Sequence, residues 1–340
     1  MKEKKCYILG IESSCDDTAA AVIYNGSVLS NVVATQKIHE DYGGVVPELA
    51  SRAHQQNIVP VVEQALRKAN IDKKELSAIA FTRGPGLMGS LLVGTSFSKS
   101  LALGLEVPLI EVNHMQAHIL AHFIKTKNQR IPKFPFIALT ISGGHTQIVK
   151  VTDYFSMQIL GQTIDDAVGE AFDKSAKILG LAYPGGPILD AYAQKGNPQA
   201  YVFPKPKVNP MDFSFSGLKT AVLYFIQKEV KQNPNFISEN MEDICASIQF
   251  TIVTYLIDKL KNAVKFTGIK EIAIGGGVSA NSGVRTALKE AEKKYGWTTY
   301  VPNFEFCTDN AAMIAIVGEL KYKSKIFANS DVVASPRLSL

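Results

Sequence analysis

The chain has 340 residues, 46% of them hydrophobic, and a formal net charge of +5. This length allows one large or two medium domains with a sizeable core, and the mild positive charge is compatible with a nucleic-acid partner without requiring one. The four cysteines show neither CxxC nor zinc-knuckle spacing, which excludes a cysteine-based zinc site and predicts reduced thiols in a cytoplasmic protein.

The first residues lead directly into an expected strand, without the apolar core of a signal peptide. The longest apolar stretch, residues 90–105, contains Ser, Thr, Lys and Gly. We therefore expect a buried helix there, and no membrane span.

Taken in order, the elements predict an internal duplication. Residues 6–33 predict three strands joined by tight turns, and residues 134–160 repeat this pattern. A helix, a strand and a glycine-containing loop follow in each half, at 47–69, 76–81 and 82–86 and at 249–266, 270–274 and 275–279. The glycine-containing loop follows the three-strand segment at a greater distance in the second half than in the first. This difference predicts an insertion of about sixty residues in the second half, roughly 161–230.

Two βββαβα halves facing each other across a cleft describe the actin/hexokinase/Hsp70-like ATPase fold, an α/β class. We expect an N-terminal subdomain at residues 1–133 and a C-terminal subdomain at residues 134–340. In such a fold the hairpin turns hold phosphates and a glycine-rich loop holds adenosine.

Two histidines indicate a metal site. His114 and His118 are four residues apart, which places both rings on one face of a helix, and Asn113 is a plausible N-cap for that helix. Asp309, at the start of a later apolar helix, can complete a His₂Asp set that suits Fe²⁺ or Zn²⁺. The alternative is two ordinary helix histidines and an aspartate favoured by the helix dipole. His122 continues the same face and is better explained as a packed or surface histidine.

Glycine-rich turns indicate a nucleotide site in the second half. Ser142, Gly143 and Gly144 form a turn without bulky side chains, which lets backbone N–H groups approach an anion. Residues 275–277 follow a strand and precede a helix start at Asn281, so a purine and its ribose can approach. The alternative is that both segments are simple turns.

An acidic segment lies between these turns. Asp165, Asp166, Glu170 and Asp173 are expected on one helix, with the last three on one face, as partners for ribose hydroxyls or ammonium groups. The alternative is an exposed acidic face neutralised by lysines. A rigid turn at 183–187 and then Asp190 follow.

The first hairpin turn carries carboxylates whose roles stay open. Glu12 and Asp16 are candidate catalytic residues, and with Asp17 they leave weak ATP hydrolysis possible. The alternative is turn chemistry alone.

The motifs together resemble one family. The chain contains GIESSCDDT, DYGGVVPELASR, GPGLMGSLLVG, NHMQAH, SGGHTQ, DDAVGEAFDK, YPGGP, FSFSGLKT, GGGVSAN and CTDNAAMIA. This set, which extends over nearly the whole chain, is similar to the bacterial tRNA adenosine threonylcarbamoyltransferases, the TsaD family, formerly described as O-sialoglycoprotein endopeptidases.

The resemblance implies a function and a site. It implies transfer of threonylcarbamoyl from threonylcarbamoyl-AMP to N6 of adenosine 37 in tRNAs that read ANN codons, with a paralogous TsaB subunit and the ATPase TsaE as partners. It implies one metal per chain, Fe²⁺ with Zn²⁺ as the alternative, on His114, His118 and Asp309. ATP or AMP can occupy the same cleft as the adenylate. The implied nucleotide contacts are Thr140, Ile141, Ser142, Gly143, Gly144, Asp173, Gly186, Asp190 and Asn281.

One departure from the family pattern bears on the reaction. The family motif often reads HxEGH, whereas this chain has Gln116 and Ala117 between the histidines. A metalloprotease needs a general base beside its metal, and Gln116 cannot accept a proton. The metalloprotease alternative is therefore disfavoured, and an ATP-dependent kinase or chaperone of the same fold remains the other alternative.

Overall fold

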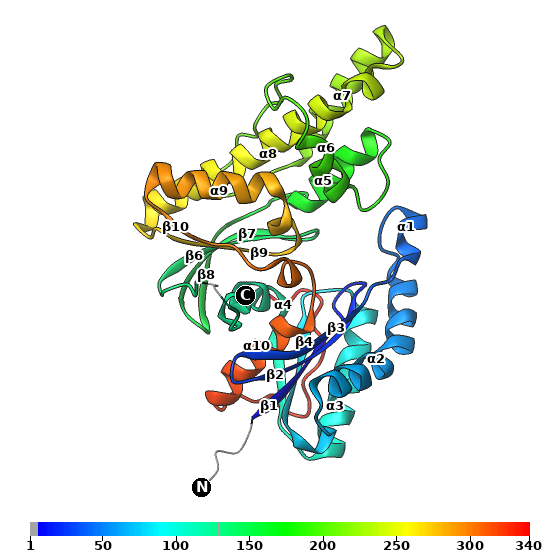
Figure 1. The fold of residues 1–340 in the computed structure, drawn as a ribbon, viewed down its shortest axis with the longest axis vertical. Coiled ribbons are helices and arrows are strands. Elements are labelled where there is room, and N and C mark those ends of the chain that lie inside the picture. The colour runs from blue at the N-terminus through cyan, green and yellow to red at the C-terminus, as the bar shows by residue number, and fades with distance from the viewer. Residues whose placement is uncertain (1–5, 128–129) are drawn as a thin grey trace. The chain divides into compact units, whose positions relative to one another are not determined.

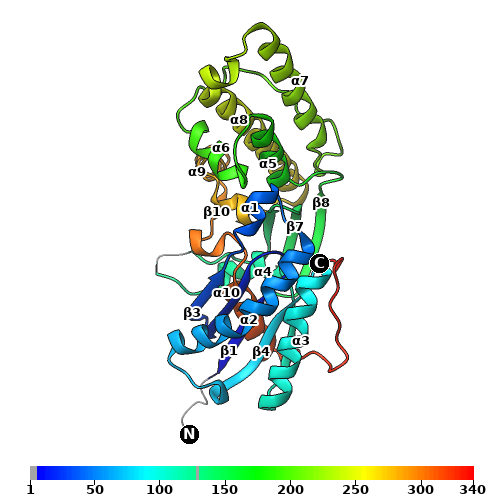
Figure 2. The same cartoon turned by 90° about the vertical axis from the view of Figure 1, so that its right-hand side faces the viewer.

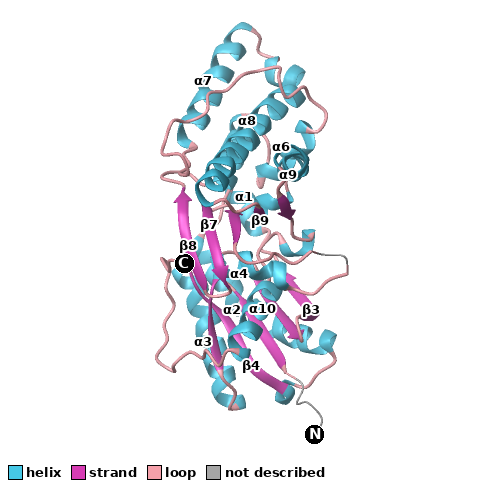
Figure 3. Cartoon of the chain, turned by 90° about the vertical axis from the view of Figure 1, so that its left-hand side faces the viewer, coloured by secondary structure: helices cyan, strands magenta, loops and turns pink. Residues whose placement is uncertain are grey.

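The computed structural model describes residues 6–127 and 130–340 (Figure 1). The chain forms two compact units. The first takes in the described part of Met1–Ile131 together with Asn303–Leu340, and the second is Pro132–Pro302. Each unit contains one five-stranded sheet with helices packed against it (Figure 3).

The first sheet has the strand order β3-β2-β1-β4-β5. β1 pairs antiparallel with β2 and parallel with β4, β2 pairs antiparallel with β3, and β4 pairs parallel with β5. Its strands are β1 (Tyr7–Glu12), β2 (Thr18–Tyr24), β3 (Ser27–Ala34), β4 (Leu76–Gly84) and β5 (Leu109–Asn113).

Helices cover both faces of this sheet because its central strand β1 is apolar except for its last residue, Glu12; all six residues of β1 are buried. α2 and α3 pack on one another and on the sheet, as Figure 2 shows, while α10 packs against β1, β2 and β4. The helices of this unit are α1 (Ile38–Tyr42), α2 (Pro47–Ala69), α3 (Met88–Leu105), α4 (His114–Leu120) and α10 (Ala311–Lys323), with short 3₁₀ turns at Lys73–Glu75, Ala121–Phe123 and Phe304–Phe306.

The second sheet repeats the topology of the first. Its order is β10-β9-β6-β7-β8, with β6, β7, β8, β9 and β10 in the places of β1, β2, β3, β4 and β5. The strands are β6 (Phe136–Ile141), β7 (Thr146–Asp153), β8 (Ser156–Gln162), β9 (Glu271–Gly275) and β10 (Thr298–Tyr300). The hairpin, helix and strand pattern predicted from the sequence is thus present in both halves.

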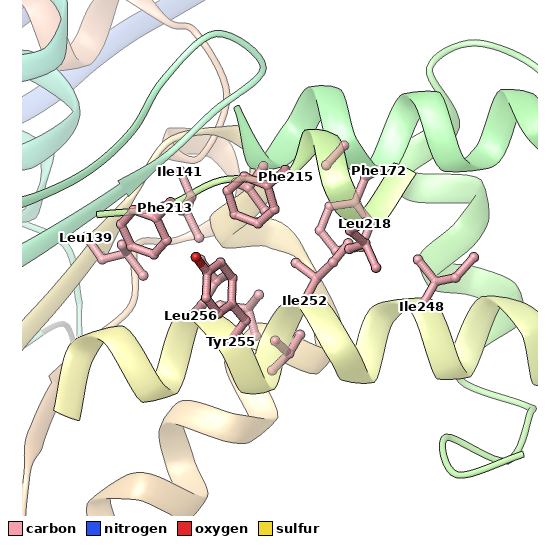
Figure 4. Packing of buried hydrophobic residues seen from close by; sticks show 14 of the residues in the cluster. Leu139, Ile141, Phe172, Phe213, Phe215, Leu218, Ile248, Ile252, Tyr255 and Leu256 are labelled. Atoms are coloured by element: carbon pink, nitrogen blue, oxygen red, sulfur yellow. The ribbon is translucent and has the colours of Figure 1, made fainter. Parts of the chain in front are cut away.

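Three helices lie between β8 and the long helix α8, in the region where the sequence predicts an insertion. The helices of this unit are α5 (Val168–Ile178), α6 (Gly185–Ala193), α7 (Ser216–Gln232), α8 (Phe236–Thr267) and α9 (Ser282–Tyr295), with a 3₁₀ turn at Gly277–Ala280. Aromatic side chains pack between these helices and the sheet. The ring centroid of Tyr255 on α8 lies 6.0 Å from that of Phe213 and 5.7 Å from that of Phe215, just before α7. Figure 4 shows these rings beside Leu139 and Ile141 of β6.

The C-terminal boundary differs from the expected division at residue 134. Residues 303–340 belong to the same unit as residues 6–131, because α10 buries its apolar surface on β1, β2 and β4. Nine consecutive residues of α10, from Ala311 to Glu319, are buried. Sequence order alone assigns this helix to the second half.

None of the helices in residues 6–127 and 130–340 is long and apolar enough to cross a membrane.

The close contact between α10 and β1 predicts that one methyl group added at Gly10 destabilises the fold. A Cβ added at Gly10 would lie 2.5 Å from the Ala311 carbonyl oxygen and 2.6 Å from the Ala315 backbone nitrogen. We expect Gly10→Ala to lower the free energy of unfolding by about 1–3 kcal/mol, measured by urea denaturation. Gly104→Ala is the control, because nothing lies within 4 Å of its added Cβ; an equal loss in both variants would contradict the argument.

Candidate functional site

The helix that carries the two histidines begins where the sequence predicts. β5 ends at Asn113, whose side-chain oxygen accepts hydrogen bonds from the backbone N–H groups of Met115 at 2.9 Å and Gln116 at 3.1 Å. α4 therefore begins at His114. The rings of His114 and His118 lie edge to face on one side of this helix, with centroids 4.7 Å apart.

Asp309 lies beside both histidines, at the start of α10. Its Oδ1 is 3.3 Å from His114 Nε2 and 3.2 Å from His118 Nε2. One ligand atom from each of the three residues lies within 4.8 Å of the others. The three residues predicted as metal ligands thus form one cluster in the first unit, although Asp309 lies almost two hundred positions after the histidines in sequence.

The donors of this cluster fit a metal ion. Both ring nitrogens of His118 are buried; Nε2 faces only the Asp309 carboxylate, and Nδ1 has no hydrogen-bond partner among the described residues. A buried nitrogen left in this way costs free energy unless a ligand satisfies it. Two imidazoles and one carboxylate are a donor set suited to Fe²⁺ or Zn²⁺. His122 is also buried, but it lies outside the cluster.

Charge holds the cluster together before any ion binds. Burial opposes ionisation of Asp309, but the neighbouring His114 and His118 hold the pKa of its carboxyl well below the usual range. Burial likewise opposes a charged His114, but Asp309 and Glu12 raise the pKa of its ring.

Glu12 lies behind His114 at the end of β1 and is fully buried. Its carboxylate lies 3.1 Å from His114 Nδ1 and accepts hydrogen bonds from Thr82 Oγ1 at 2.6 Å and from the Ser14 backbone N–H at 2.5 Å. Such a carboxylate orients the imidazole and fixes which nitrogen faces the ion. Glu12 is therefore a positioning residue, and its burial makes it unsuited to accept a proton from a substrate.

Sequence reasoning missed the neighbours of Glu12. Ser14 Oγ lies 3.2 Å from His114 Nδ1, and Thr82 contacts Glu12 from the adjacent strand. Serine and threonine carry no distinguishing pattern in sequence, so only their position beside the expected Glu12 could have indicated them. Asp16, the other candidate catalytic residue, is partly exposed in the same turn.

The turn between β6 and β7 has the open form expected of an anion site. Ser142 donates its backbone N–H to the His145 carbonyl at 2.9 Å, and His145 returns its N–H to Ser142 Oγ at 3.1 Å. A Cβ added at Gly143 or Gly144 would meet nothing within 4 Å. A ligand can therefore reach the backbone of this turn.

Two other glycines bring neighbouring elements against that turn. Gly276 has a φ of +90°, and a Cβ there would lie 2.5 Å from the Ile141 carbonyl oxygen. A Cβ on Gly169, in the first turn of α5, would lie 2.7 Å from the Ser142 carbonyl oxygen. The end of β6, with Thr140 and Ile141, the glycine loop after β9 and the start of α5 are thus adjacent at the carboxyl edge of the parallel strands.

The predicted acidic and amide ligands of this unit have internal partners. Asp173 accepts a hydrogen bond from the Gly186 N–H at 2.9 Å, at the start of α6. Burial raises the pKa of the Asp173 carboxyl, although its bonds to the backbone of Gly186 and Gly185 oppose the shift. The structure therefore brings Asp173 and Gly186 together.

A second group joins α6, α8 and α9. Asp190 accepts from the Ser282 hydroxyl at 2.5 Å and its N–H at 3.0 Å, and from Gln249 Nε2 at 3.0 Å. Asn281 donates to Gln249 Oε1 at 2.7 Å and caps α9 through the Val284 N–H. Asp190 and Asn281 thus belong to one network, and Gln249 is a member that sequence reasoning missed.

The expected acidic helix face is wrong in part. α5 begins at Val168, so Asp165 and Asp166 precede the helix. Asp165 instead accepts hydrogen bonds from Ser214, Phe215 and Ser216 at the start of α7. Lys174 lies 2.9 Å from Asp166 and 2.6 Å from Glu170, in agreement with the alternative that lysines neutralise these carboxylates.

Comparison with known proteins gives a family over nearly the whole chain. Residues 27–316 match the family model described as "TsaD: tRNA N6-adenosine threonylcarbamoyltransferase". A protein of that name from Christiangramia forsetii is 71% identical over 337 residues, covering 99% of each chain. Another from Phocaeicola vulgatus is 58% identical, covering 98% of this chain and 99% of that protein.

Solved structures agree with the expected fold. A nucleotide- and phosphate-bound HypF matches with a TM-score of 0.61 at 15% identity, over 96% of this chain and 48% of that one. Component A of (R)-2-hydroxyglutaryl-CoA dehydratase from Acidaminococcus fermentans matches with a TM-score of 0.52 at 16% identity, over 92% and 96%. With the duplicated sheets, these matches confirm the actin/hexokinase-like ATPase fold.

The position of Glu12 behind His114 predicts an effect on metal affinity. Glu12→Gln keeps the shape of the side chain but removes the charge that orients His114, so we expect the dissociation constant for Zn²⁺ to rise about 10–100-fold. Calorimetric titration of the purified variant measures this constant. The exposed Glu63→Gln on α2 is the matched control; equal affinities in both variants would show that Glu12 does not support the site.

Proposed function

This chain belongs to the TsaD family of tRNA N6-adenosine threonylcarbamoyltransferases, and we propose that it transfers threonylcarbamoyl from threonylcarbamoyl-AMP to adenosine 37 of tRNAs that read ANN codons. Family membership gives the reaction class, a transferase that modifies N6 of a tRNA adenosine. The donor, the position in the tRNA and the metal are the parts that we propose. The observation that best supports the metal is the buried cluster of His114, His118 and Asp309.

We assign one metal ion, Fe²⁺ with Zn²⁺ as the alternative, to this cluster. When bound, the ion would supply positive charge that stabilises oxygens of the donor as charge develops on them. Glu12 holds His114 with Nε2 directed toward Asp309, and Ser14 lies on the same Nδ1 side of the ring. Of the two candidate catalytic carboxylates, the partly exposed Asp16 stays a candidate proton acceptor.

We assign the adenylate to the second unit. The open turn of Ser142, Gly143 and Gly144 offers its backbone to the phosphate, beside the buried strand end Thr140–Ile141. In this proposal the glycine loop after β9 and Asn281 lie next to the ribose and adenine. Asp173, Gly186 and Asp190 are the remaining residues of the proposed adenylate site. The carboxylates of Asp173 and Asp190 have lone pairs beyond their internal hydrogen bonds and so can also accept hydrogen bonds from ribose hydroxyls.

The position of Gln116 argues against a metalloprotease. A protease of the HExxH type has its glutamate base directly after the first histidine, where this chain has Met115, and Gln116 follows Met115 in the same helix. Neither a thioether nor an amide can act as that base. Phosphoryl transfer by an ATP-dependent kinase of this fold stays the second alternative, because Asp16 and Asp17 lie in the first hairpin turn.

The basic residues support a need for partner subunits. Lys321 donates to the Glu111 carbonyl and Lys323 pairs with Glu319, so this lysine group is engaged within the fold. Lys205 pairs with Asp258. With a net charge of only +5, we expect the chain alone to bind tRNA phosphates weakly, because affinity rises with the number of phosphates that a protein neutralises. We propose that a TsaB-like paralogue and the ATPase TsaE complete a tRNA-competent assembly in the cytoplasm.

Removal of one ligand should remove the metal. We expect Asp309→Ala to lose about one equivalent of bound Fe²⁺ or Zn²⁺ and to lose transfer activity, because two imidazoles alone hold a divalent ion weakly. Elemental analysis and mass spectrometry of tRNA nucleosides measure the two losses. Asp41→Ala, an exposed change on α1, should alter neither. Full metal occupancy in Asp309→Ala would refute the ligand assignment.

Reconstitution tests the partners. The chain alone, supplied with threonylcarbamoyl-AMP and tRNA, should modify little or no adenosine, and adding the TsaB and TsaE proteins should restore modification. The same assay with tRNAs that lack an ANN-reading anticodon should give no product. If the complete mixture leaves adenosine unmodified while the chain phosphorylates a small molecule, the kinase alternative is correct.

A further inference from the structure

Residues 326–340, which we name the strap, form an extended segment along the first unit. The Ala328 N–H donates to the Leu109 carbonyl at the start of β5 at 2.8 Å, and Lys99 of α3 donates to the Val332 carbonyl at 3.0 Å. Figure 2 shows the strap in red beside α3. Because β5 is the edge of its sheet, the strap lies along that edge.

The strap then passes over the end of β4. The Ser335 N–H donates to the Arg83 carbonyl at 2.8 Å, and the Gly86 N–H donates to the Pro336 carbonyl at 3.2 Å. The approach is so close that a Cβ on Gly84, which has a φ of +155°, would lie 1.9 Å from the Ser335 carbonyl oxygen. The strap is therefore seated on the segment 84–86 through backbone contacts.

The strap next reaches the start of the metal-binding helix. Asn113 Nδ2 donates to the Ser339 carbonyl at 2.9 Å, while Oδ1 of the same amide caps α4. The strap thus fixes which way this amide faces, and so holds the capping oxygen under the first turn. His114 is the first residue of that turn.

A second chain of hydrogen bonds connects the strap to the Nδ1 side of the His114 ring. The Leu87 N–H, next to Gly86, donates to the Ser14 carbonyl at 2.7 Å. Ser14 in turn contacts His114 Nδ1 and donates its N–H to Glu12. The strap therefore contacts both the segment that holds Ser14 and the residue that caps the histidine helix.

We propose that residues 335–340 position the metal centre by holding Asn113 and the segment 84–87, so that these residues support metal affinity without contacting the ion. This inference rests on the metal site of the proposed function. Residues behind a ligand commonly change metal affinity about 10–100-fold when they are lost. We assign Asn113 a role beyond helix capping, as the link between strap and site.

Asn113→Ser tests the link, because serine is also a good N-cap but has no amide to donate to Ser339. A chain ending at Ser335 tests the strap itself, since it lacks both acceptor carbonyls while keeping the Ser335–Arg83 bond. Asn197→Ser, at an exposed position in the second unit, is the matched control, and His118→Ala reports on the metal site itself.

The readouts are the dissociation constant for Co²⁺ and the visible absorption spectrum of bound Co²⁺, which reports ligand geometry. We expect Asn113→Ser and the shortened chain each to weaken Co²⁺ binding about 10-fold and to change the spectrum, with helix content by circular dichroism unchanged. Asn197→Ser should match the parent chain. If both variants bind Co²⁺ with the parent affinity and spectrum while His118→Ala does not bind, the proposal is wrong. If His118→Ala also binds like the parent, the metal site of the proposed function is wrong instead.

Discussion

The structure of the first unit depends on how closely α10 approaches the sheet. Gly10 on β1 and Gly318 on α10 allow this approach, since a Cβ on Gly318 would lie 2.5 Å from the Ala80 Cβ. Dispersion forces and burial along this contact hold α10 against the sheet, and Asn310 caps its start by accepting the Met313 N–H at 3.0 Å. Asp309, two residues before that start, is brought against His114 and His118 as a result. A packing contact between small residues thus helps to place the carboxylate that we propose as the third metal ligand.

Charges alternate across the buried cluster that this packing creates. Glu12, His114 and Asp309 place an imidazole between two carboxylates, which stabilises the arrangement although Glu12 and His114 are buried and Asp309 is only partly exposed. Thr82 and Ser14 supply the remaining hydrogen bonds to Glu12. Support of this kind holds His114 in a defined orientation on α4, a helix of only seven residues.

The second unit uses the same sheet topology for a different chemistry. Its hairpin turn has Gly143 and Gly144, whereas in the first hairpin the Ser14 hydroxyl contacts His114 and the Cys15 carbonyl accepts a hydrogen bond from Ser90 Oγ of α3. Backbone is exposed in the second turn, whereas the first turn is packed and contacts His114. In the function that we propose, one duplicated fold therefore serves as an anion-binding turn in one unit and as a support for the metal site in the other.

The sequence by itself determined the duplicated strand pattern, the start of α4 at His114 and the glycine turns, because hydrophobic periodicity, the Asn113 cap and glycine spacing act over a few residues. The His114–His118 pair could be predicted for the same reason. Only tertiary structure decided that residues 303–340 return to the first unit, that Asp165 binds the segment at the start of α7, and that Glu12 lies beside His114. These contacts join residues far apart in sequence, and packing rather than local conformational preference selects them.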